Sequence, residues 1–146
     1  MIAQTIQLAL APVFMLVAIG NIMNILSTRL GRVVDRSRHL QARHGDTSGA
    51  EHDMVVLEIR LVDRRIKLIG RALLLLVASA VIIGFTVGLL FVEEMAKLDL
   101  HRVVATTFFI SVALLMVALT LFLHETRIAT AALRIPDNYL ELHRKL

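Results

Sequence analysis

The feature that most constrains this chain is a set of three apolar segments, each 21 residues long. They cover residues 6–26, 72–92 and 103–123, and the second and third contain no charged side chain. An α-helix rises 1.5 Å per residue, so about 20 apolar residues cross the hydrocarbon core of a bilayer. Three core helices of a soluble bundle would each need a polar face, which the last two segments lack. The sequence, 57% hydrophobic, therefore predicts an all-α integral membrane protein with three transmembrane helices.

The 16 Lys and Arg residues are unevenly distributed, and their positions predict the orientation. Residues 29–71 hold ten of them, the segment 93–102 holds two, and the chain after His124 holds four. Segments rich in Lys and Arg stay in the cytoplasm. We therefore expect a multi-pass protein of the plasma membrane with its N-terminus outside and its C-terminus in the cytoplasm.

The basic segment between the first two spans is patterned as a helical hairpin. In its second half, apolar residues recur in alternating steps of four and three, as in a coiled coil, at Val55, Ile59, Val62, Ile66, Ile69 and Leu73. Between the halves lies a turn-forming cluster, Gly45 to Gly49, and Ser48 with Glu51 has the spacing of a capping box. The expected organisation is a first span over 1–28, a cytoplasmic antiparallel helical hairpin over 29–71, a second span over 72–92, an external loop over 93–102, a third span over 103–123 and a cytoplasmic tail over 124–146.

An antiparallel hairpin that turns near Thr47 places residue i opposite residue 94 − i, which predicts ion pairs. Asp35 would then lie near Arg60 and Arg64. After the third span, Glu125 should reach the same depth as Arg29 and Arg71, and we expect it to pair with one of them. Snorkelling and attraction to anionic lipid headgroups are equally good reasons for arginine at this level.

One face of the first span carries its polar side chains, which are, from the outer to the inner end, Gln7, Asn21, Asn24 and Thr28, with Phe14 among them. Such a face should point at protein or water, because polar groups are costly against lipid. In one interpretation the two asparagines hold the three helices together through hydrogen bonds to Ser79, Thr86, Thr106, Thr107 or Ser111. In the other, several subunits place this face around a pore, with Phe14 as its constriction and Arg29 and Arg32 in its inner vestibule.

Small residues recur every four positions in the second span, at Ala80, Gly84 and Gly88. This spacing is typical of close helix packing in membranes, within one chain or between chains. Together with the hairpin seam, it predicts a homo-oligomer.

Several function classes are disfavoured. The chain has no cysteine, which excludes disulfides, thiolate catalysis and Cys-ligated clusters. His124-Glu125 lacks the second histidine of a zincin motif, since Ile128 stands there. A His and Asp group at the hairpin tip (His39, His44, Asp46, His52, Asp53) is expected to be a solvated turn, not a metal site. We therefore expect no enzyme, no cofactor, no metal and no nucleic-acid partner.

The sequence also resembles a known family. Pro12-Val13-Phe14, Asn24-Ile25-Leu26 and the arginines from Arg29 to Arg38, with Phe108-Phe109-Ile110 and Glu125 later on, are similar to the bacterial membrane-protein domain-of-unknown-function family numbered 2721. The resemblance implies a three-span protein of the bacterial inner membrane and implies no activity. The leading hypothesis is a homo-oligomeric pore for an inorganic ion, lined by the first span. The alternative is a non-conducting scaffold or accessory subunit whose hairpin binds a partner protein.

Overall fold

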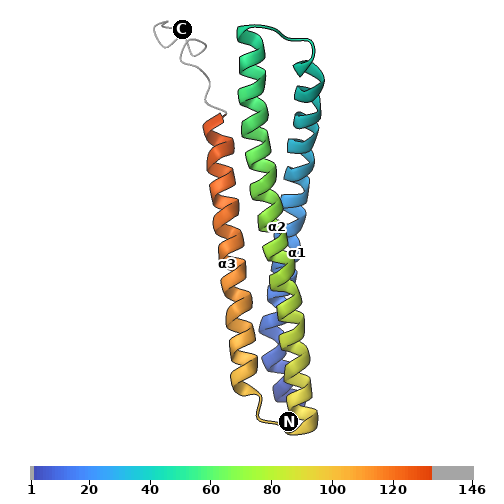
Figure 1. Ribbon diagram of the computed structural model, residues 1–146. Helices are drawn as coiled ribbons and strands as arrows, with labels where there is room; N and C mark the ends of the chain where they lie inside the picture. Colours follow the sequence, from blue (N-terminus) through green and yellow to red (C-terminus); the bar gives the residue numbers. More distant parts are fainter. Residues whose placement is uncertain (1, 133–146) are drawn as a thin grey trace, which may run out of the picture.

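The computed structural model describes residues 2–132, which form three helices and no strand. They are α1 (Ile2–His44), α2 (Ala50–Ala96) and α3 (His101–Ala132). Figure 1 shows that they run antiparallel in one elongated bundle, with the α1–α2 turn projecting past the end of α3. Each helix is long and apolar enough to cross a membrane. The predicted all-helical architecture, with three helices of membrane-spanning length, is thus confirmed.

Helix α2 lies between the other two helices, and it packs along both of them. Buried residues repeat every seven positions, which is the spacing of a left-handed coiled coil. In α1 they are Ile19, Leu26, Val33 and Leu40, and in α2 the corresponding seam is Val55, Val62, Ile69, Leu76 and Ile83. A second buried seam of α2 at Ala72, Ser79 and Thr86 faces α3, where Ser79 bonds to Ser111 and Thr86 bonds to Thr107. The sequence periodicity therefore continues from the hairpin through the membrane spans.

The turn between α1 and α2 occupies residues 45–49, as predicted, but its capping differs from the prediction. Gly49 is the N-cap residue of α2, with φ 64°, a left-handed conformation that suits glycine. No side chain caps this helix end, so the expected capping box of Ser48 and Glu51 is wrong. Glu51 instead pairs with Arg43 across the turn at 2.9 Å. The Glu51 carboxylate therefore binds the Arg43 guanidinium on the facing helix and does not cap the backbone at the start of α2.

The hairpin has the predicted register, in which residue i faces residue 94 − i. Arg36 pairs with Glu58 at 2.6 Å, and Arg43 pairs with Glu51. Asp35, Arg60 and Arg64, which were predicted to pair, are exposed and make no ion pair within residues 2–132.

The reason for that difference is rotation about the helix axis. Asp35 is two residues from the buried Val33, and Arg60 and Arg64 are each two residues from the buried Val62. Two residues turn a helix by about 200°, so all three side chains point away from the facing helix. The predicted register gives the correct position of each residue along the hairpin. The heptad repeat decides the direction in which its side chain points.

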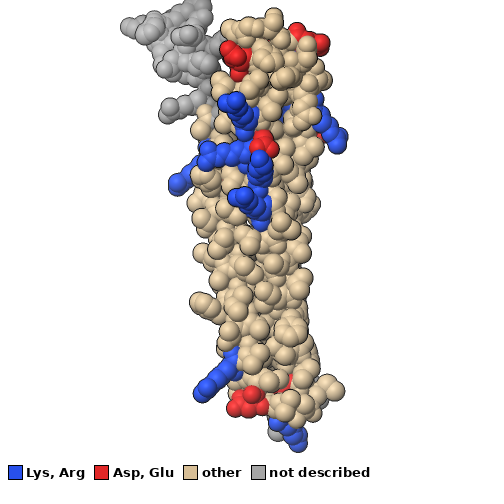
Figure 2. Space-filling view, viewed as in Figure 1, with Lys and Arg blue, Asp and Glu red and all other residues tan. Residues whose placement is uncertain are grey.

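A wide band around the middle of the bundle carries no charged side chains on the face shown in Figure 2. Figure 2 shows a cluster of Lys and Arg toward the hairpin end, charged groups at the opposite end, and an uncharged surface between them. Along α2 this band runs from Ala72 to Val92, which corresponds to about 31 Å of helix and matches a bilayer core. The part of the expected tail from 133 onward lies outside the described residues.

Candidate functional site

Three charged side chains, one from each helix, meet where the uncharged band ends at the hairpin side. Glu125 is one heptad after the buried Ala118 of α3, and Arg65 is one heptad before the buried Ala72 of α2. Arg29 follows the half-buried Ile22 of α1 by the same interval. The repeat that forms the apolar core therefore also directs these three side chains inward. We call this group the Glu125 clamp.

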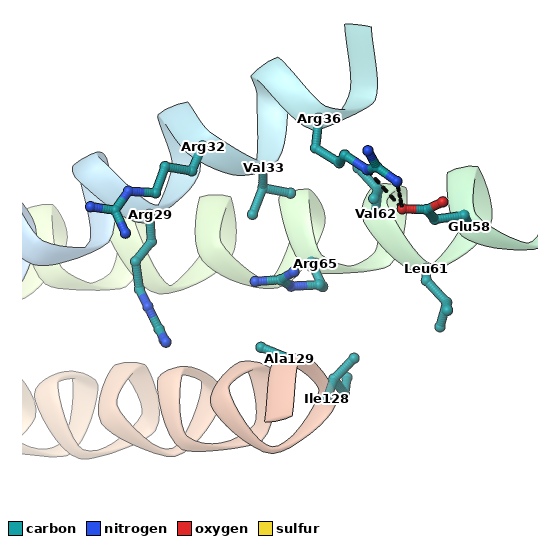
Figure 3. A pocket seen from close by; sticks show the side chains of 10 residues that line it. All are labelled: Arg29, Arg32, Val33, Arg36, Glu58, Leu61, Val62, Arg65, Ile128 and Ala129. Carbon is teal, nitrogen blue, oxygen red and sulfur yellow. Dashed lines mark hydrogen bonds and ion pairs between the residues drawn. The ribbon is translucent and has the colours of Figure 1, made fainter. Parts of the chain in front are cut away.

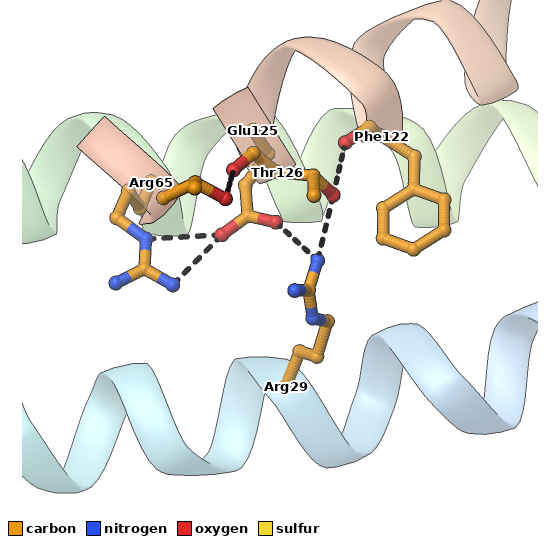
Figure 4. A network of polar contacts seen from close by, with 6 residues as sticks. Arg29, Arg65, Phe122, Glu125 and Thr126 are labelled. Carbon is orange, nitrogen blue, oxygen red and sulfur yellow. Dashed lines mark hydrogen bonds and ion pairs between the residues drawn. The ribbon is translucent and has the colours of Figure 1, made fainter. Parts of the chain in front are cut away.

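Both oxygens of the Glu125 carboxylate are occupied, and the side chain has no exposed surface (Figure 4). Arg65 donates from Nε at 3.0 Å and from Nη2 at 2.9 Å to Oε1. Arg29 donates from Nη1 to Oε2 at 2.8 Å and to the Thr126 hydroxyl at 2.8 Å. The Arg29 guanidinium also lies 5.2 Å from the ring centroid of Phe122, in a cation–π contact. One carboxylate thus ties α3 to both α1 and α2.

The electrostatics of the clamp favour a fixed arrangement of the helices. A buried carboxylate is tolerated only when it is paired and hydrogen-bonded, and two arginines meet both needs here. The arginine side chains keep 32% (Arg29) and 24% (Arg65) of their surface, so water or lipid headgroups still reach them. The cost of burial therefore falls mainly on Glu125, and sliding or rotation of α3 would leave its charge unpaired.

The sequence predicted an ion pair of Glu125 with Arg29 or Arg71, and the structure contains the pair with Arg29. Arg71 is exposed and makes no ion pair among the described residues. Arg71 is one residue from Ala72 in the seam of α2 that faces α3. Its side chain therefore points about 100° away from the direction of that seam. Arg65 was not predicted as a partner, although its seven-residue distance from Ala72 was a signal that could have identified it.

The polar face of the first span lies on the side of α1 that faces away from α2. Gln7, Asn21 and Thr28 each come two residues after a buried position, and they are exposed together with Asn24 and Arg32. Phe14 on the same face is 69% exposed. Arg29 was predicted to line the same surface, but the structure turns its guanidinium to Glu125.

No described residue hydrogen-bonds to the side-chain amides of Asn21 and Asn24. The Ser and Thr residues that were candidate partners bond elsewhere. Ser79 donates to the carbonyl of Ser111 at 2.8 Å, and the Thr86 and Thr107 hydroxyls are 2.9 Å apart. The interpretation in which the asparagines hold the three helices of one chain together is therefore wrong. These two hydrogen bonds join α2 to α3, and α1 takes no part in them.

The small-residue face of α2 is also largely unused within the chain. Gly84 and Gly88 are exposed, and a Cβ atom at either position would meet nothing within 4 Å. Only Ala80 packs against the core. Close packing at the two glycines therefore does not occur among the three described helices.

At the other end of the bundle, the structure brings together Glu93, Asp99 and His101, each offering a metal-ligand atom within 4.8 Å of the others. Glu93 Oε1 lies 2.6 Å from His101 Nδ1, while Asp99 and His101 are exposed. Sequence reasoning did not combine His101 with the two carboxylates, although all three residues fall within the expected loop 93–102. At the hairpin tip, the rings of His44 and His52 are in contact, with centroids 4.5 Å apart, and the described residues there form no metal-ligand set.

The fold and these features indicate a multi-pass membrane protein with three helices. A comparison with protein families matches residues 9–135 to the family described as "Protein of unknown function (DUF2721)". The chain therefore belongs to the DUF2721 family, which confirms the resemblance noted from its residues. Searches of the curated proteins and of the solved structures find no match.

Proposed function

We propose that this protein forms a homo-oligomeric pore for inorganic ions in the bacterial inner membrane, lined by the polar face of α1. The observation that carries the proposal is the exposure of that face. Its amides lie on the side of α1 that faces away from α2, at the edge of the three-helix unit, and no described side chain covers them.

The depth of Asn21 makes an unpaired amide there expensive in a monomer. Asn21 precedes Arg29 by eight residues, so it lies about 12 Å inside the level of the clamp. An amide without a hydrogen-bond partner in hydrocarbon costs several kcal/mol. Facing a water-filled axis, or another copy of the same face, removes this cost. A single three-helix unit is too thin to enclose such an axis, so the pore requires several subunits.

The polar face also suggests separate roles along the axis. Phe14 lies seven residues outward of Asn21, about 10 Å along the helix, and its exposed ring can act as a hydrophobic constriction. Gln7 is at the outer mouth, and Asn24 and Thr28 lie between Asn21 and the inner end. Arg32 remains as the charged group of the inner vestibule, because Arg29 is bound to Glu125.

The proposed orientation places the hairpin in the cytoplasm and the 93–102 loop outside. The ten Lys and Arg residues of 29–71 support it through the positive-inside rule. A Thr47→Cys variant of this cysteine-free chain gives a direct test with a membrane-impermeant maleimide on intact cells. We expect labelling only after permeabilisation. Labelling of intact cells would show that the hairpin lies outside and would refute the proposed orientation.

Ion flux into liposomes that contain the purified protein tests conduction. Asn21→Leu should reduce the flux, because an apolar ring replaces the amide ring, and Phe14→Ala should increase it by widening the constriction. Phe109→Ala is the matched control, because this ring on α3 is similarly exposed, at 74%, and lies outside the polar face. Equal effects of the two phenylalanine variants would refute the assignment of α1 to the axis.

A non-conducting scaffold is the second candidate, and one observation favours it. The α2 arm of the hairpin exposes Met54 (71%), Leu57 (58%) and Leu61 (45%) along one side. Apolar side chains of this kind, outside the membrane, fit a partner protein. Silent liposomes that contain intact oligomers, tested with common cations and anions, would favour the scaffold over the pore.

A further inference from the structure

A cavity of about 390 Å³ opens where α3 ends against the hairpin (Figure 3). Helices α1 and α3 both pack on α2 and hardly on each other, and the cavity lies between them at the level of Ile128 and Ala129. Four arginines line the cavity, three from α1 (Arg29, Arg32, Arg36) and one from α2 (Arg65). The cavity therefore combines a gap between two helices with a concentration of guanidinium groups.

The positive charge of the cavity is only partly compensated. Glu58 takes Arg36, and Glu125 at the inner edge takes both Arg29 and Arg65. Two carboxylates thus face four guanidinium groups. Arg32 has no ion-pair partner within residues 2–132.

Hydrogen-bond donors remain unused at the same place. The bonds to Glu125 and Thr126 use only Nη1 of Arg29, and those of Arg65 use Nε and Nη2. No residue within 2–132 bonds to the Nη2 group of Arg29 or to the Nη1 group of Arg65, which leaves both groups available to an acceptor. A planar fork of donors beside an unpaired arginine is the arrangement that binds phosphate oxygens.

The height and the remaining lining of the cavity indicate where the phosphate comes from. Arg29 is the first charged residue after the apolar span of α1, and the cavity extends from there toward Glu58, at the level of the headgroups. Aliphatic side chains form its other walls, with Leu61 and Val62 from α2 and Ile128 from α3. A cavity that is basic on one side and aliphatic on the other suits an amphiphile better than a free ion.

We propose that this cavity binds the phosphate headgroup of an anionic phospholipid. Arg32 and the unused donors of Arg29 and Arg65 hold the phosphate, and the aliphatic walls contact the glycerol region. The bound lipid fills the gap between α1 and α3. The site needs no oligomer, although it shares Arg32 with the inner vestibule of the proposed pore.

The test measures how much phosphatidylglycerol stays with the purified protein after exchange into phosphatidylcholine nanodiscs, quantified by mass spectrometry. Arg32→Gln should lower the affinity about tenfold, the value of one charge-assisted contact. Arg64→Gln is the matched control, since it removes the same charge from an exposed arginine outside the cavity. We expect less than a threefold effect for the control.

Each outcome decides the proposal. Equal losses in the two variants would mean attraction to the membrane surface alone and would overturn the site. Retention that disappears when millimolar inorganic phosphate is added would assign the cavity to a free anion and overturn the lipid assignment. Retention that depends on Arg32 and resists free phosphate supports the proposal, whether or not the same preparation conducts ions.

Discussion

Replacing Glu125 by Gln should release α3 from the other two helices at the hairpin end of the bundle. The substitution keeps the size of the side chain and removes the charge that receives three N–H groups from Arg29 and Arg65. Breaking a buried ion pair by removing one partner costs about 3–5 kcal/mol. Here the two arginines are 32% and 24% exposed and can return to water or headgroups, which lowers the cost. We therefore expect a loss of about 2–3 kcal/mol in the free energy of unfolding.

Reversible unfolding in mixed micelles of SDS and a mild detergent, followed by circular dichroism, measures this loss. Arg36→Gln is the control, because it breaks an ion pair in which Arg36 is 49% and Glu58 is 41% exposed. Such a pair contributes less than about 1 kcal/mol.

A double-mutant cycle identifies the mechanism. If Arg65 stabilises the fold through the carboxylate, Arg65→Gln should cost less than about 0.5 kcal/mol once Glu125 is already Gln. A Glu125→Gln variant as stable as the control variant would refute the reasoning. The reasoning would also be refuted if Arg65→Gln cost as much free energy of unfolding in the Glu125→Gln variant as in the natural chain.

Three further predictions concern helix packing. Ser79 is fully buried and donates to the α3 backbone, so Ser79→Ala should cost about 0.6 kcal/mol and Ser79→Leu about 1–3 kcal/mol from overpacking, both measured by unfolding in SDS. Gly84→Ala and Gly88→Ala should leave the three-helix unit equally stable, or more stable by up to about 1 kcal/mol each, because an added Cβ meets nothing; a marked loss in the monomer would contradict this placement. In the cysteine-free chain, Arg43→Cys with Glu51→Cys should cross-link through a short bismaleimide, whereas Arg43→Cys with Arg60→Cys should not, since Arg60 lies about 13 Å further along α2; equal cross-linking would refute the register.

The number of helices and the hairpin register could be predicted because they depend on properties that are local in the sequence. Hydrocarbon accepts only uncharged segments of sufficient length, and the turn-forming residues between Gly45 and Gly49 leave one place for the reversal. The ion pairs of Asp35 were predicted wrongly because depth alone was considered, without the rotation that the buried Val33 imposes. The rotation of α2, fixed by the buried Ala72, likewise explains why Arg65, and not Arg71, reaches Glu125.

The sequence by itself determined that this chain forms three helices of membrane-spanning length, where the chain reverses between the first two, and that it belongs to the DUF2721 family. Only the tertiary structure decided which faces of those helices meet. It placed a carboxylate from α3 between arginines of α1 and α2, and it left the amides of the first span uncovered. The physical reason is that hydropathy depends on composition within a segment, whereas contacts between helices depend on their mutual rotation and offset, which arise only when the helices pack.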